Sequence, residues 1–178
     1  ALKNGTYSGK ALLAESEALL DLSGHFNPNA ERYAAELDIK RLEPVRYMPN
    51  DSLMLLEGFV QIEGKGYDMF KSSTDIKIDA AISEVQYKEL VFSDITLNGS
   101  LKEHRANLNL NSANPHLAVN GLLDGIIKKD SIQAMLVIDA DSIDLYGLQV
   151  TQKPFSTTFQ IFSELETNLD KQYQVDVT

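Results

Sequence analysis

The sequence predicts an all-β protein: a long, curved, mostly antiparallel sheet that forms an open groove, with one or two short helical turns. Three observations support this fold class. Strand after strand alternates apolar and polar residues, and this period of two gives a strand one apolar face and one polar face. Glycines recur within the apolar phase of these strands. No segment keeps the 3.6-residue period of a packed helix.

The alternation predicts strands over residues 6–14, 17–26, 32–40, 54–65, 74–82, 84–92, 94–102, 105–112, 116–124, 131–140, 155–163 and 171–178. Short connections such as Asn27-Pro28-Asn29 and Asn114-Pro115 separate these strands, and such turns favour antiparallel hairpins. Lys102-Glu103-His104 is a third connection of this kind. Two interruptions, 43–50 with its two prolines and 67–72, are predicted as single helical turns.

The apolar phase of these strands is almost free of charge, so one continuous apolar face is expected. Such a face either closes on itself as a core or remains partly open to an apolar ligand. The recurrent inward glycines and the repetition of strand units favour the open arrangement. The predicted floor of the groove consists of Leu20, Leu22, Leu37, Ile39, Val60, Ile62, Ile76, Ile78, Ile95, Leu97, Leu108, Leu110, Val119, Leu136, Ile138, Phe159 and Ile161.

Glycine placement is the second signal. The glycines that fall in the apolar phase of a predicted strand are Gly24, Gly58, Gly64, Gly99 and Gly121. An inward glycine lets a sheet bend or another group approach closely. Asn98-Gly99 and Asn120-Gly121 resemble type I′ hairpin turns, but the alternation continues in phase through both, so we predict in-strand glycines.

Composition excludes several classes. The length of 178 residues suits one domain, and 43% apolar with 24% charged residues is ordinary for a folded protein. A formal charge of −10 argues against nucleic acid as a partner and against a polybasic membrane anchor. Without cysteine there is no disulfide, thiolate metal site or Cys nucleophile. The strand-like alternation up to Val177 suggests a piece of a longer protein.

A divergent repeat covers about 17–66 and 116–150. Each copy has a Leu-rich strand with an apolar-phase glycine, Gly24 or Gly121, followed by a strand that contains Asp38 or Asp139. The second copy carries a small insertion. Repeated strand units that do not close are typical of solenoids and long grooves. We therefore expect a single groove segment over 1–178 that contains both copies.

These repeats resemble those of TamB/AsmA-type proteins over roughly 17–150. The resemblance rests on the motif Leu-x-Leu-x-Gly followed by 37–42 or 140–148, and on similar stretches at 97–101 and 112–117. It implies a β-taco-like, bridge-like lipid-transfer groove in the periplasm, part of a Gram-negative envelope protein anchored in the inner membrane. It also implies phospholipid transport, a role in outer-membrane biogenesis and an Omp85-type outer-membrane barrel as partner. The sequence shows no signature of the region that docks on that barrel.

No catalytic constellation is recognisable, so we expect a protein that is not an enzyme and needs no cofactor or metal. The histidines His25, His104 and His116 share no metal-ligand spacing. Asp139, Asp141 and Asp144 lack the glycine and the bidentate glutamate of a calcium loop, so a solvated face is the favoured interpretation.

Two functional hypotheses remain at this point. The favoured one is a hydrophobic groove that conducts phospholipid acyl chains, because an apolar floor without charge offers no fixed headgroup site. The alternative is a closed β-sandwich that serves as a structural or adhesive module and binds a protein or a glycan. The absence of tryptophan weakens a glycan site, since sugars usually stack on Trp or Tyr.

Overall fold

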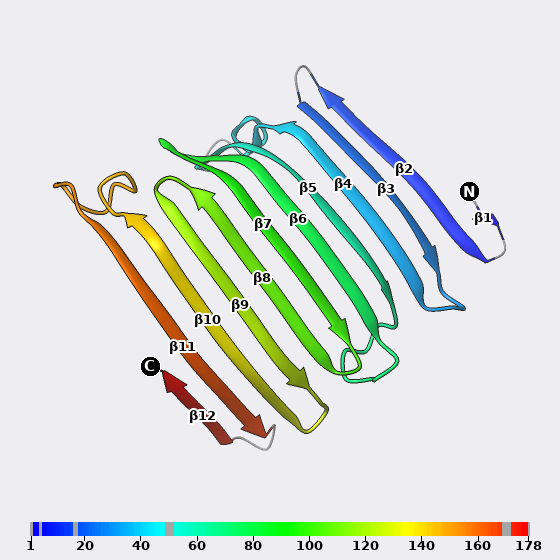
Figure 1. The fold of residues 1–178 in the computed structure, drawn as a ribbon. Coiled ribbons are helices and arrows are strands. Elements are labelled where there is room, and N and C mark those ends of the chain that lie inside the picture. The colour runs from blue at the N-terminus through cyan, green and yellow to red at the C-terminus, as the bar shows by residue number, and fades with distance from the viewer. Residues whose placement is uncertain (1, 4, 16–17, 49–51, 169–171, 178) are drawn as a thin grey trace.

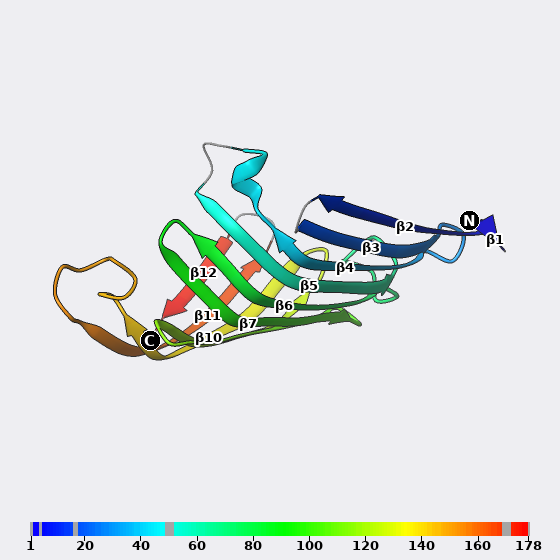
Figure 2. The ribbon, with the colours of Figure 1, turned by 90° about the horizontal axis from the view of Figure 1, so that it is seen from above.

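A computed structural model describes residues 2–3, 5–15, 18–48, 52–168 and 172–177, and it shows one 12-stranded sheet (Figure 1). The strands follow one another in chain order, and each pairs with the next in an antiparallel ladder. The sheet is curved and open (Figure 2). The predicted fold class is confirmed.

The strands are β1 (Leu2–Lys3), β2 (Thr6–Glu15), β3 (Ala18–Asn27), β4 (Arg32–Leu42), β5 (Leu53–Lys65), β6 (Asp75–Tyr87), β7 (Leu90–Lys102), β8 (Arg105–Asn114), β9 (Leu117–Ile127), β10 (Ser131–Asp144), β11 (Ser156–Asn168) and β12 (Gln172–Val177). Most of them run a few residues longer than the sequence predicts. The predicted strand limits at residues 17, 171 and 178 lie outside the described residues.

The sheet is a single layer. Within the described part of the chain, strands contact only their neighbours in the sheet, and the one further contact joins β5 to the 3-10 turn η1 (Pro44–Arg46). A compact protein of 19.8 kDa would expose about 8,600 Å², whereas this chain exposes 11877 Å². The excess is what a sheet with no second layer over it would produce.

One part of the strand prediction is wrong. The sequence predicts three strands over 74–82, 84–92 and 94–102, but the structure has only β6 and β7, joined by a turn at Lys88-Glu89. Between the pairs Ile82–Ile95 and Glu84–Ser93 the ladder skips one residue on each strand, Ser83 and Asp94, without changing the register. The interruptions of the alternation are therefore irregularities inside two strands. Lys88, with a φ of 55°, makes the turn without the glycine, proline or asparagine that would reveal it in a sequence.

The two predicted helical turns differ in outcome. The segment 43–50 contains η1, with Pro44 at its start, where the missing N–H of proline costs nothing; its residues 49–50 lie outside the described residues. The segment 67–72 forms no helix, because successive turns close it, with hydrogen bonds from Lys71 N to Asp68 O and from Thr74 N to Lys71 O. No helix within the described residues is long and apolar enough to cross a membrane.

Candidate ligand-binding face

The strand register gathers the predicted groove residues on one side of the sheet. Residues that pair across an antiparallel ladder point to the same face, so a row of paired residues can be followed from strand to strand. One such row runs through Ala11, Leu22, Leu37, Val60, Ala80, Leu97, Leu110, Gly121, Ile138 and Ile161. A neighbouring row runs through Leu13, Leu20, Ile39, Gly58, Ile82, Ile95, Ser112, Val119, Ala140 and Phe159.

A third row contains Ile62, Ile78, Leu108 and Leu136, and Ile76 belongs to the row beside it. All seventeen predicted residues therefore share one face, which we call the apolar face; the opposite side is the polar face. Their role in binding a ligand stays a prediction.

The apolar face is not covered. None of the seventeen residues is fully buried, and Leu22, Leu110 and Phe159 remain 45%, 39% and 40% exposed. Among the described residues of the strands, Leu55 and Ala140 are the only buried hydrophobic side chains. The alternation that normally fills a core here produces a surface with large, half-exposed apolar side chains.

This face is almost free of charge. Between Tyr7 and Thr167, its paired positions in the described strands hold no Asp, Lys, Arg or His, and they hold one Glu, Glu15 at the end of β2. Its buried polar side chains find partners: Ser112 Oγ donates to Leu117 O at 2.6 Å, and Asn114 Nδ2 donates to Val91 O at 3.3 Å. At the opposite strand ends, Thr167 Oγ1 donates to Asn168 O at 3.2 Å. From β3 onward, an apolar ligand on this face would meet no uncompensated charge.

All in-strand glycines among the described residues lie on the apolar face, as predicted for those named above. They are Gly9, Gly24, Gly58, Gly64, Gly99, Gly121 and Gly125. Both Asn-Gly pairs lie inside strands, β7 and β9, and the choice against hairpin turns is confirmed.

At several of these glycines the space that a side chain would occupy is filled by different groups: neighbouring side chains at some positions and backbone atoms at others. A Cβ on Gly99 would lie 2.8 Å from both Ile78 Cγ2 and Leu108 Cδ1, so side chains of the two flanking strands lean over it. A Cβ on Gly58 would lie 2.6 Å from the Ala81 carbonyl oxygen, which shows a close approach of backbones. Such convergence is expected on the inner side of a curved sheet, and we take the apolar face as the floor of the groove.

Near the start of the chain the apolar face has a hollow of about 610 Å³ over β2, β3 and β4. Gly9 and Gly24 pair with each other there, and no atom would lie within 4 Å of a Cβ on Gly9. Phe26 and Tyr33 stand along one side, and the Tyr67 ring packs 5.9 Å from Tyr33 and 6.2 Å from Phe26. Burial raises the pKa of Tyr33, and the neighbouring Tyr67 adds to the shift.

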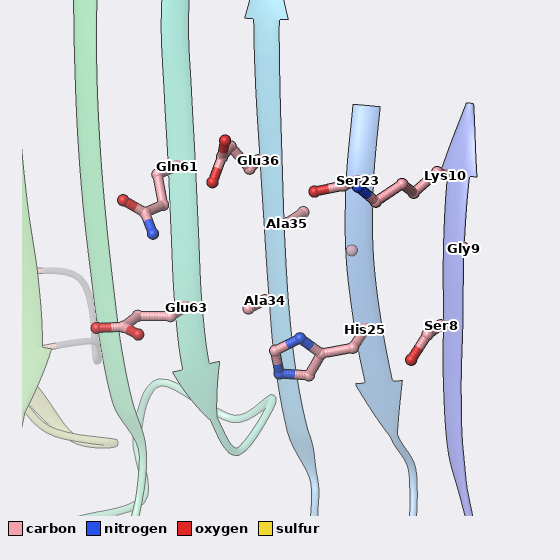
Figure 3. A pocket seen from close by; sticks show the side chains of 11 residues that line it. Ser8, Gly9, Lys10, Ser23, His25, Ala34, Ala35, Glu36, Gln61 and Glu63 are labelled. Carbon is pink, nitrogen blue, oxygen red and sulfur yellow. The ribbon is translucent and has the colours of Figure 1, made fainter. Parts of the chain in front are cut away.

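The polar face has a second hollow, of about 550 Å³, over β2 to β5 (Figure 3). Lys10, His25, Glu36 and Glu63 line it together with serine and alanine side chains. The labelled side chains stand apart instead of converging on one point (Figure 3). No three His, Asp or Glu side chains of the described residues come close enough to hold a metal ion.

The rest of the polar face is held by ion pairs and amide hydrogen bonds between strands. Lys77 Nζ lies 2.8 Å from Asp79, and the hydrogen bonds from Lys77 and then Asn98 lower the pKa of Asp79. Arg105 contacts Asp124 at 3.0 Å, and its hydrogen bond is the largest cause of the lowered pKa of Asp124. The Lys77–Asp79 pair lies within β6, whereas the Arg105–Asp124 pair joins β8 to β9. Both pairs are open to solvent, so each contributes little to stability.

The acidic residues singled out in the sequence do not converge. Asp139 pairs with Asn120 on the polar face, and Asp141 accepts a long 3.5 Å hydrogen bond from Asn120 Nδ2. Asp144 is the last residue of β10; its carboxylate accepts a hydrogen bond of 2.9 Å from Gly147 N and contacts His116 Nδ1 at 3.0 Å. The Gly147 N–H and then His116 lower the pKa of Asp144.

The other histidines lie apart. His25 is on the polar face of β3, and His104 forms the β7–β8 turn with its Nδ1 buried.

The predicted floor omits several residues that belong to the same face. Tyr7, Phe26 and Tyr33 continue the apolar rows at the strand ends, and the alternation could have included them. Tyr67 could not have been found in this way, because a loop carries it onto the face.

The two proposed repeat copies both contain a register shift directly after the Asp38 and Asp139 positions. Register shifts also occur at other strand pairs, so the division into two repeat copies stays a prediction. Comparison of the chain with protein-family models, curated proteins and solved structures gives no match.

Proposed function

We propose that the apolar face binds the acyl chains of lipids and guides them along the groove. The observation that supports this most directly is the continuous, half-exposed apolar face that crosses the sheet from β2 to β11 and is free of charge from β3 onward. A soluble protein rarely exposes an apolar patch of this extent without a ligand or partner.

The dimensions suit a hydrocarbon chain. Strands lie about 4.8 Å apart, so the face from β3 to β11 is about 38 Å long across the strands. Each buried methylene contributes about 0.8 kcal/mol, so a sixteen-carbon chain would gain about 12 kcal/mol before the cost of ordering it. A binding free energy of this size does not require a charged side chain that holds the headgroup.

The absence of positive charge also indicates what the face does not select. A lipid headgroup with a phosphate would find no Lys or Arg on this face. The apolar face would therefore recognise the acyl chain of the lipid and not its headgroup. A uniform floor of Leu, Ile, Val and Gly gives similar contacts at successive positions. This uniformity favours movement along the groove over one tight site.

The biological setting extends this proposal. The resemblance to TamB/AsmA-type repeats suggests the periplasmic part of an envelope protein whose parent is anchored in the inner membrane. In that setting the groove would carry phospholipid acyl chains between membranes and support outer-membrane biogenesis, with an Omp85-type barrel as a partner. The net charge of −10 remains unsuited to nucleic acid.

The natural absence of tryptophan provides a direct test. Leu110→Trp places the single indole on the apolar face, and Asn109→Trp, one residue away, places it on the polar face. A fatty acid with a brominated acyl chain quenches an indole only at close range. We expect strong, saturable quenching for Leu110→Trp and little for Asn109→Trp.

Equal quenching at both positions, or none at Leu110→Trp in a folded variant, would refute the proposal. If the protein instead bound no lipid but captured a glycan or a protein, the adhesive module would be the better account.

A further inference from the structure

One end of the sheet has a rim of connected loops. Because neighbouring strands alternate in direction, the connections β4–β5, β6–β7, β8–β9 and β10–β11 all lie at the same strand ends (Figure 1). Hydrogen bonds join these connections in pairs. Lys88 N donates to Ser52 O at 2.7 Å, Gln149 Nε2 donates to Glu89 at 3.3 Å, and Asp144 N donates to His116 O at 3.0 Å. The described parts of the four connections therefore form one hydrogen-bonded rim.

This rim exposes large apolar side chains that the groove does not use. Tyr146, Val150 and Phe155 in the β10–β11 loop are 52%, 68% and 55% exposed. The rim also exposes Tyr47, Met48 and Tyr87. We call these six residues the aromatic rim.

The backbone of the β10–β11 loop bonds to itself. Leu145 N donates to Phe155 O at 2.9 Å, and Val150 N donates to Leu145 O at 2.8 Å. Gln149 N donates to Tyr146 O at 2.9 Å. A loop with its N–H groups paired internally loses little when it leaves water for the headgroup region of a bilayer.

The charges of the rim suit an electrically neutral lipid surface. Among the described residues of the rim, the three cations Arg46, Lys88 and Lys153 equal in number the anions Glu43, Glu89 and Asp144. The Lys88 ammonium lies 5.5 Å from the centre of the Tyr87 ring. Aromatic rings with a nearby cation are typical of the membrane interface.

We propose that the aromatic rim seats this protein on the surface of a phospholipid bilayer, with Tyr146, Val150 and Phe155 inserted among the headgroups. Phe92 and Leu117 on the apolar face lie at the strand ends that carry the rim. A lipid acyl chain that leaves the bilayer there would reach the groove without crossing water. The rim stands on its own observations, and the proposal does not require that the groove conducts lipid.

The experiment is flotation with vesicles of phosphatidylcholine. The triple variant Tyr146→Ser, Val150→Ser and Phe155→Ser should lower the vesicle partition coefficient about tenfold or more, because interfacial binding scales with inserted apolar area. The matched control is Met69→Ser, Phe70→Ser and Ile126→Ser, which removes exposed apolar side chains at the opposite strand ends. This control should change the partition coefficient less than about twofold.

Thermal unfolding of both triple variants shows that they are folded before they are compared. A wild-type protein that does not float with the vesicles would overturn the proposal and leave the rim as a contact for another protein. An equal loss in the two triple variants would also overturn it.

The experiments distinguish a failure of the membrane-binding proposal for the rim from a failure of the acyl-chain-binding proposal for the groove. Quenching of Leu110→Trp by a brominated fatty acid is measured below the concentration at which the fatty acid forms micelles, and no bilayer is present. The rim variant should keep this quenching. A rim variant that lost quenching and flotation together, while folded, would show that the two surfaces are not independent and would refute the rim as a separate site.

Discussion

The two faces of the sheet share one backbone and differ in almost every other respect. The apolar face carries Leu, Ile, Val and all the described in-strand glycines, whereas the polar face carries the ion pairs and amide ladders. In an ordinary antiparallel sheet the apolar side would be sealed by a second layer. Here that side is open, and the contacts that hold the strands together run across the sheet and not through a core.

This difference shows that alternation alone does not imply a core. A period of two predicts which side chains share a face, but only the tertiary structure shows whether another layer covers that face. The curvature of the sheet brings apolar side chains of neighbouring strands together, as Ile78 and Leu108 do over Gly99. Partial burial of this kind, repeated over many strands, takes the place of a sealed interior.

The largest expected effect comes from filling a glycine that the curvature requires. Gly58→Ala would put a Cβ 2.6 Å from the Ala81 carbonyl oxygen, so we expect a loss of about 2 kcal/mol or more in the free energy of unfolding. Urea denaturation measures it. Gly121→Ala is the control, because its Cβ would meet Leu110 at an ordinary 3.5 Å, and it should change stability by less than about 1 kcal/mol. Equal losses would show that crowding at Gly58 does not matter.

A charge on the apolar face comes next. In an open groove the guanidinium of Leu97→Arg can reach water along its own stem, so the variant should fold and lose only about 1–2 kcal/mol, far less than an unpaired charge in a sealed core costs. Binding of a fluorescent fatty acid should be lost. Thr96→Arg, on the polar face, should keep that binding. Collapse of the Leu97→Arg fold would mean that the face is sealed.

A change at the strand ends should strengthen the sheet without touching either face. Glu103 and His104 form the two-residue β7–β8 turn with φ values of 50° and 70°, a left-handed conformation that side chains of this kind adopt at a cost. Replacing them with Asn-Gly should raise the free energy of unfolding by about 0.5–1 kcal/mol. Fatty-acid binding should not change. A loss of stability in the thermal melt would contradict this assignment of the turn.

The smallest effect is the acid dependence of the polar face. The pKa of Asp124 is held below its ordinary value of 3.8, chiefly by Arg105. A lowered pKa in the folded state adds stability that is present above 3.8 and is lost as pH falls through the folded value. The urea midpoint should therefore fall on acidification, and slightly less so in Arg105→Gln. Leu97→Ala, on the apolar face, should lower the midpoint by the same amount at every pH.

The sequence predicts the face better than the strand limits. Because side chains alternate with a period of exactly two, an error of a residue or two at a strand end leaves Leu97 and Leu110 on the correct face. The β6–β7 hairpin was beyond prediction, because Lys88-Glu89 lacks turn residues and the irregularities near Ser83 and Asp94 imitate turns. The contribution of Tyr67 was also hidden, since a loop places its ring against β3 and β4 residues distant in the chain.

The openness of the sheet was suggested by glycines such as Gly99 and Gly121 in the apolar phase. The alternation does not predict the aromatic rim, because it places Tyr87 and Phe155 in strands and says nothing of the other four residues. Five of its residues lie in loops and Tyr87 ends β6; these segments are far apart in the sequence and meet only because the strands alternate in direction.

The central claim is that the apolar face, and no other surface, holds acyl chains. A photoreactive amino acid placed in turn along β7 tests it, with the purified protein loaded with a phospholipid and the lipid adduct measured by mass spectrometry. Positions Ile95, Leu97 and Leu101 face the groove, and positions Thr96, Asn98 and Ser100 face away. We predict adducts at the first three positions and essentially none at the second three. Adducts at all six positions, or at none of them, would contradict the account.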